Sequence, residues 1–200
     1  MWSRDLKMGK HLLPVYADLL YRLQHNALFL GYRLQHLPGT LTLCHHGCGT
    51  LETAPHLFWN CEFAIQLWTT WLEKFQPLFT SPIEWNSVLL FIIEPTLDAK
   101  TLYGYSLFAV FHIVRAVIFR CLWMHRNDIR FHDLQPNIYD VQAKVLAVVN
   151  LHTEWFHRDL LDRSISHSSI TLRRLHTLLE YMGLQQFRPP DPNTTAIAPD

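Results

Sequence analysis

The chain has 200 residues, of which 49% are apolar and 17% are charged, so it carries enough apolar side chains to exclude disorder along its whole length. Its 17 Lys and Arg residues balance 17 Asp and Glu residues, and this zero net charge gives no support to a stand-alone nucleic-acid binder, which is usually basic. The length fits one domain, or one domain with a small appendage.

The first predicted element is a helix that begins at Pro14, because proline suits the first turn of a helix. Leucines follow near helical spacing from Leu19 to Leu34, and a Leu-Pro-Gly turn at 37–39 ends the pattern. Residues 1–13 form an N-terminal extension without the apolar core of a signal peptide. We therefore expect an intracellular protein, in the nucleus or the cytoplasm, that is not secreted.

A second helix is predicted to begin near Pro55 or Glu62 and to run to about Phe75, because its apolar residues recur at helical spacing. Two prolines mark the loop that follows, and a short helix is predicted within 84–93.

The longest predicted helix runs from Leu97 to about Phe131, and the width of its apolar face implies burial on most sides. Residues 102–124 are apolar enough to suggest a membrane span, but two arginines and one histidine interrupt them. A charge near the centre of a bilayer costs at least about 2.5 kcal/mol. We therefore interpret this segment as the central helix of a helical domain, and we expect no membrane partner.

Pro136 is predicted to begin another helix, and after a break near 164–169 a last helix spans Ser169–Tyr181 and is stopped by Gly183. The prolines of residues 188–200 predict a disordered tail. The fold class is therefore all-α. By range, we expect a zinc-binding helical region at 14–75, a region with the long helix at 76–131 and C-terminal helices at 132–187.

Three of the four cysteines crowd into the stretch CHHGCGTLETAPHLFWNC, residues 44–61. In a reducing compartment such clustering is typical of metal ligands and not of a disulfide scaffold. The candidate ligands are Cys44, Cys48, His56 and Cys61, and three Cys with one His are a standard ligand set for structural Zn²⁺. The sequence therefore predicts a zinc knuckle inserted between helices.

Two alternatives remain open from these residues alone. Free cysteines are among the most buried residue types, so the three could be ordinary core residues. His45 or His46 could also replace Cys44 as a ligand, because two residues separate His45 from Cys48, which is the commoner spacing.

Two motifs in this order resemble the reverse transcriptase zinc-binding domain of non-LTR (LINE-like) retrotransposons. The first is C-x3-CG-x2-ET-x2-HLFW-x-C-x-FA-x2-LW at 44–68, and the second lies in LWMHRNDIRF at 122–131. The residues that carry the resemblance are Cys44, Cys48, Glu52, Thr53, His56, Leu57, Phe58, Cys61, Leu67, Trp68, Trp123, Arg126, Asn127 and Phe131. The resemblance covers about residues 14 to 131, and the gap between the first two cysteines is one residue longer than is usual in the family.

A ligand set of three Cys and one His leaves no open coordination position, so we expect a structural metal and no enzyme activity. The Tyr16-Ala17-Asp18 stretch looks briefly like a polymerase motif, but the converging carboxylates that two-metal phosphoryl transfer needs are missing. Glu52 is interpreted as a cap, or as a hydrogen-bond partner of the backbone near the knuckle. Arg126 and Asn127 are interpreted either as a C-terminal helix cap or as a contact to a phosphate.

The resemblance implies a module that lies C-terminal to the polymerase in a long polyprotein. The predicted function is that of a zinc-binding, non-catalytic nucleic-acid-binding module derived from such a polyprotein. Its expected partners are RNA or DNA and the reverse transcriptase domain of the parent polyprotein. The alternative is a helical protein-interaction domain with a purely structural zinc, which the neutral charge favours, and a decayed element without a selected function also remains open.

Overall fold

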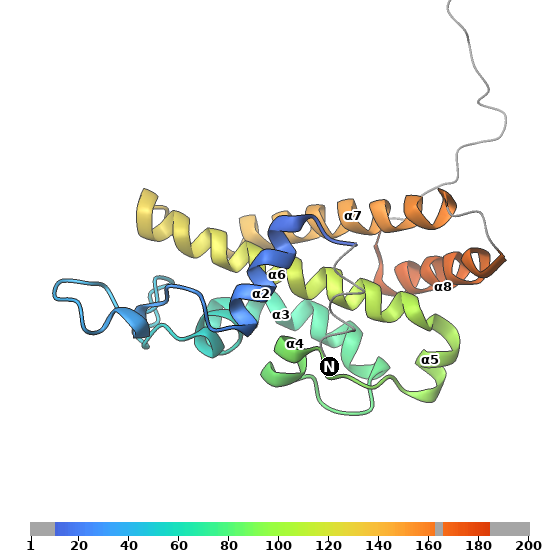
Figure 1. Ribbon diagram of the computed structural model, residues 1–200, viewed down its shortest axis with the longest axis horizontal. Helices are drawn as coiled ribbons and strands as arrows, with labels where there is room; N and C mark the ends of the chain where they lie inside the picture. Colours follow the sequence, from blue (N-terminus) through green and yellow to red (C-terminus); the bar gives the residue numbers. More distant parts are fainter. Residues whose placement is uncertain (1–10, 163–165, 185–200) are drawn as a thin grey trace, which may run out of the picture.

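The computed structural model describes residues 11–162 and 166–184, and these residues form helices and no β-strand (Figure 1). The all-α prediction is confirmed. The described elements are α2 (Pro14–Gln24), a 3-10 turn η1 (Gly31–Leu34), a π-helical turn η2 (His56–Asn60), α3 (Glu62–Phe75), a 3-10 turn η3 (Gln76–Leu78), α4 (Trp85–Leu90), α5 (Leu97–Tyr103), α6 (Tyr105–His132), α7 (Ile138–Asp162) and α8 (Ser166–Met182). The predicted tail at 188–200 lies outside the described residues.

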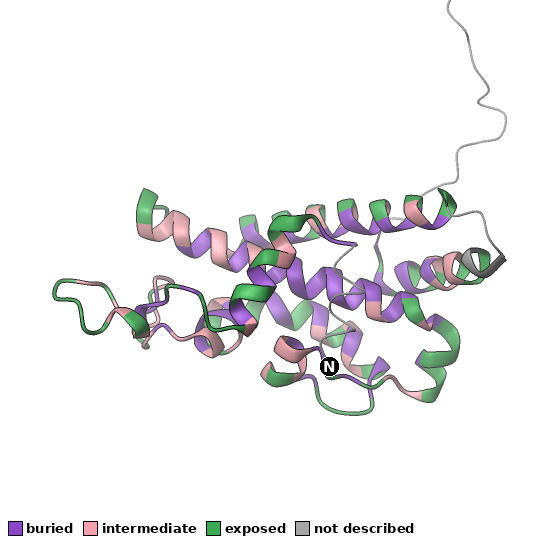
Figure 2. Ribbon diagram, in the orientation of Figure 1, coloured by how far each residue is buried: buried purple, intermediate pink, exposed green. Residues whose placement is uncertain are grey.

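Helix α6 is the centre of the fold and packs against α2, α3, α7 and α8. Every side chain from Ala109 to Phe119 is buried, whereas residues 127–130 are half-buried and only Phe131 and His132 at the end of α6 are exposed (Figure 2). By length and composition α6 is apolar enough to cross a membrane, but 78% of its most apolar stretch is buried inside the protein. A core helix has this burial, so its apolar width is explained by the helices around it.

The long helix predicted from Leu97 to Phe131 is broken at Gly104, and that prediction is wrong at this point. Gly104 has φ 50° and ψ −127°, a backbone conformation that is open to glycine and strained for other residues. The break separates α5 from α6 although the apolar pattern continues across it. Thr96 starts α5 independently, because its hydroxyl accepts a hydrogen bond from the Ala99 N–H at 3.2 Å.

The first predicted helix is also too long, because α2 ends at Gln24. Asn26 adopts a left-handed φ of 52°, and the Ala27 N–H donates to the Arg22 carbonyl at 2.7 Å. This bond closes a Schellman motif, which satisfies the last carbonyls of a helix. Leu28 and Leu30 therefore lie in a loop, where both are buried and Phe29 between them is exposed. This alternation of period two fits extended backbone better than helix.

The remaining boundaries agree more closely with the sequence. Helix α3 ends at Phe75, α4 lies within 84–93, and α7 begins two residues after Pro136. Gly183 ends α8 at φ 65°, where the Leu184 N–H donates to the Leu179 carbonyl at 2.9 Å. Helix α8 begins at Ser166, so the predicted break at 164–169 is shorter than expected, and 163–165 lie outside the described residues.

The three predicted helical regions pack on one continuous hydrophobic core. Leu12, within the predicted N-terminal extension, is buried in that core, whereas residues 1–10 lie outside the described part of the chain. The range boundaries between regions stay a prediction.

Candidate metal centre

Cys44 and Cys48 lie on the turn of a small hairpin between residues 42 and 52. The Cys44 N–H donates to the Thr50 carbonyl at 2.8 Å, and the Glu52 N–H donates to the Thr42 carbonyl at 3.0 Å. The two glycines of this turn have φ values of 86° and 69°, which glycine adopts without strain. The hairpin thus presents both sulfurs toward the start of the helix that follows.

His56 and Cys61 are brought together by the π-helical turn η2. In an α-helix, five residues at about 100° each would put the two side chains about 140° apart. Here the Cys61 N–H donates to the His56 carbonyl at 2.7 Å, an i→i+5 bond whose wider turn aligns them more closely. The indole N–H of Trp68 donates to the Phe58 carbonyl at 2.8 Å and fixes this turn to α3.

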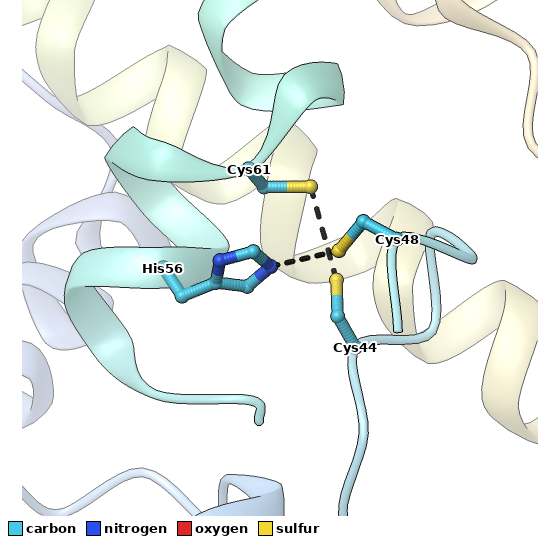
Figure 3. Close-up of side chains that lie close together, drawn as sticks. All are labelled: Cys44, Cys48, His56 and Cys61. Carbon is cyan, nitrogen blue, oxygen red and sulfur yellow. Dashed lines mark hydrogen bonds between the residues drawn. The ribbon is translucent and has the colours of Figure 1, made fainter. Parts of the chain in front are cut away.

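The four candidate ligand atoms all lie within 4.8 Å of one another (Figure 3). The sulfurs of Cys44 and Cys61 are 3.8 Å apart, and 2.9 Å separates the Cys48 sulfur from His56 Nε2. In a tetrahedral site with Zn–S bonds of about 2.3 Å, two sulfurs lie about 3.8 Å apart. The donor set and the Cys44–Cys61 spacing therefore fit a metal ion such as Zn²⁺. The Cys48 sulfur and His56 Nε2 lie closer together than the separation of about 3.6 Å in a tetrahedral site with Zn–N bonds of about 2.0–2.1 Å, so these two side chains would move apart around an ion.

The rival ligands take other places beside the cluster. His45 Nδ1 lies 2.9 Å from Glu52 Oε2, so this ring faces the carboxylate. His46 Nδ1 is 3.6 Å from the Cys61 sulfur, and its ring stacks on Phe63 at 4.4 Å between centroids. The structure thus brings Cys44 into the four-residue group and leaves His46 at its edge.

The thiols of Cys44 and Cys61 share a hydrogen bond. The hydrogen bond with Cys61 raises the pKa of the Cys44 thiol, with burial as the next cause. The same hydrogen bond lowers the pKa of the Cys61 thiol, and burial opposes this shift. A bound metal ion would need both sulfurs as thiolates, so binding would release protons.

Glu52 joins this knuckle to the central helix. Its side chain is fully buried, Oε2 accepts from Arg126 Nε at 3.0 Å, and Oε1 accepts from the Gly31 N–H at 3.0 Å. Burial alone would raise the pKa of the Glu52 carboxyl, but the hydrogen bonds and charge of Arg126, with the His45 and Gly31 hydrogen bonds, outweigh burial and lower it. Glu52 is therefore an ionised partner inside the fold, and its bond to Gly31 matches the backbone contact expected from the sequence.

The position of Arg126 contradicts its interpretation as a helix cap. Arg126 is buried six residues before the end of α6, so it is not a C-terminal cap. Besides Glu52, its guanidinium donates to Asn127 Oδ1 at 2.9 Å and lies 5.1 Å from the Trp123 ring. In this arrangement Arg126 has almost no exposed surface to offer a phosphate, and the nucleic-acid role of Arg126 and Asn127 stays a prediction.

No known protein family matches the sequence, and neither curated proteins nor solved structures show a significant similarity to it. The protein is all-helical and contains a buried group of three Cys and one His that can hold a metal ion.

Proposed function

We propose that this chain binds one structural Zn²⁺ through Cys44, Cys48, His56 and Cys61. The observation that carries the proposal is the convergence of the four ligand atoms within 4.8 Å from two separate elements, a hairpin turn and a π-helical turn. Thiolate and imidazole ligands in a closed tetrahedron suit Zn²⁺, and such a site contributes folding free energy instead of chemistry.

The role proposed for the module is non-catalytic binding of RNA or DNA, in an intracellular compartment, as in the retrotransposon zinc-binding domain that its motifs resemble. The support is the pairing of the two motifs: Glu52 of the first and Arg126 of the second form one buried ion pair. A role beside the reverse transcriptase domain of a parent polyprotein belongs to the same proposal.

The metal proposal is tested by zinc analysis of the purified chain. We expect one zinc per wild-type chain and loss of most of it in Cys48→Ser and His56→Ala, because three remaining ligands hold the ion weakly. The matched controls are Cys121→Ser, a buried cysteine of α6 outside the cluster, and His36→Ala, an exposed histidine. A wild-type chain without zinc, or equal loss in the controls, would overturn the proposal.

The nucleic-acid role is tested by gel shift with the zinc-loaded chain at low salt. Binding that weakens as salt rises is expected, because phosphate contacts release counterions. The second candidate, a helical protein-interaction domain, is favoured by the zero net charge and by exposed apolar residues such as Leu146 and Trp155 on α7. No shift at low salt, with a protein recovered on the immobilised chain, would favour that candidate.

A further inference from the structure

Two exposed phenylalanines each have an arginine beside the ring, one in the loop before η1 and one in the last turn of α6. Phe29 is 70% exposed, and the Arg33 guanidinium carbon is 6.0 Å from its ring centroid. Phe131 is 64% exposed, and the guanidinium carbon of Arg130 is 5.2 Å from its ring centroid. Among the described residues, Phe29 and Phe131 are the only phenylalanines that are exposed, and each has a guanidinium beside its ring.

The buried Arg126 connects the two Phe–Arg pairs. Its Nη2 donates to the Phe29 carbonyl at 3.4 Å, while Arg130 lies one helical turn farther along α6 and precedes Phe131. Burial and the neighbouring Arg126 charge lower the pKa of Arg130, and Glu52 opposes this shift. Arg130 is therefore close enough to interact electrostatically with both Arg126 and Glu52. The loop before η1 and the end of α6 lie at the same end of the molecule (Figure 1).

The knuckle also holds the Phe29 segment in place. Gly31 packs so closely on the hairpin that a Cβ atom there would lie 2.2 Å from the Thr42 carbonyl oxygen. Its N–H donates to Glu52, and the Tyr32 N–H donates to the Glu52 carbonyl at 3.0 Å. The position of Phe29 therefore depends on an intact knuckle.

Cations and acids both occur near these rings. No acidic residue occurs between Asp18 and Glu52 in the sequence, and Arg126 neutralises Glu52. At the end of α6, His132 lies 3.3 Å from the partly exposed Asp128, and Asp133 and Asp140 are exposed acids just beyond it. Arg33 and Arg130 are then the cations beside the exposed rings.

From these contacts we infer that Phe29, Arg33, Arg130 and Phe131 form a binding face for single-stranded nucleic acid. Each ring stacks against an unpaired base, and each guanidinium contacts a neighbouring phosphate. The inference rests on the proposed nucleic-acid role and names the substrate class: unpaired strands, not duplexes, because bases within a duplex are already stacked.

The test measures fluorescence anisotropy of a labelled oligothymidylate with the zinc-loaded full chain at low salt. Phe29→Ala and Phe131→Ala should each weaken binding about tenfold, since stacking contributes about 1–3 kcal/mol per base. Arg33→Gln and Arg130→Gln should each reduce the salt slope by about one ion. Trp155→Ala, a 49% exposed aromatic residue on α7, is the control and should bind as wild type does.

The outcomes separate this inference from the proposed function. Wild-type binding that the two Phe→Ala variants retain in full would overturn the binding face alone, provided that their zinc content and circular dichroism are unchanged. Equal affinity for a duplex of matched length would also overturn it. Failure of the wild type to bind any oligonucleotide would overturn both the face and the nucleic-acid role.

Discussion

At the scale of single residues, the Glu52–Arg126 pair is the main polar contact between the knuckle and the central helix. Both side chains are almost fully buried, and Arg126 contacts the carboxylate through two of its nitrogens. The attraction between two buried opposite charges compensates for their lost hydration. If one of them is removed, the other stays buried without a partner or water, and the folded state is destabilised.

Arg126→Met should therefore lower the free energy of unfolding by about 3–5 kcal/mol, measured by urea denaturation of the zinc-loaded protein. Adding Glu52→Gln to this variant should recover part of the loss, because it removes the stranded charge. The matched control is Arg22→Met, since Arg22 pairs with Asp18 at 2.9 Å on the surface and should change stability by less than about 1 kcal/mol. Similar losses at both sites would contradict the buried pairing.

At the scale of elements, residues with left-handed backbone divide the helices. Asn26 ends α2, Gly104 separates α5 from α6, and Gly183 ends α8. Of these, Gly104 gives the sharpest test, because a continuous helix and a broken one predict opposite signs for the same substitution.

Gly104→Ala should destabilise the protein by about 1–3 kcal/mol, because alanine at φ 50° is strained. If residues 97–131 formed one continuous helix, alanine would instead stabilise it by about 0.5–1 kcal/mol. Thermal and urea unfolding measure the difference, with the exposed Leu102→Ala as a control for a substitution on α5. A gain in stability in Gly104→Ala would instead support one continuous helix over residues 97–131.

The sequence predicts those features whose signal is local. The four candidate ligands fall within one short stretch, Pro136 precedes the start of α7, and Gly183 follows the end of α8. These positions can therefore be predicted from nearby residues alone. The helix ends at Asn26 and Gly104 are harder to predict, because leucines and other apolar residues continue past them at spacings that also fit a helix. The Glu52–Arg126 contact joins residues 74 positions apart, and nothing in one sequence pairs them.

At the scale of the whole molecule, the interior holds several histidines in their neutral form. Burial is the main cause that lowers the pKa values of His112, His125, His152 and His157, which lie on α6 and α7. In the unfolded chain each would titrate near its ordinary pKa of about 6.5. Below that pH the unfolded state binds more protons than the folded state, so stability falls as pH falls.

We expect full stability above about pH 6.5 and a decline as the pH is lowered, to which the fully buried His112 contributes up to about 1.4 kcal/mol per pH unit. Urea midpoints between about pH 7.5 and 5 measure this slope. His112→Gln should flatten it, and because the knuckle is the same in both proteins, acid release of the metal cancels from the comparison. Identical slopes in both proteins would show that His112 does not carry the effect.

The knuckle precedes Arg126, the buried partner of its Glu52, along the chain, so the knuckle is synthesised first. The four candidate ligands leave the ribosome together, whereas Arg126 follows Glu52 by 74 residues. At translation rates of about 5–20 residues per second, the knuckle waits about 4–15 seconds for α6. During that interval the short loops between the candidate ligands close at little entropic cost, so the zinc proposed above would bind before α6 is complete. We expect metal availability at that moment, more than in the finished protein, to decide how much of the chain reaches the native fold.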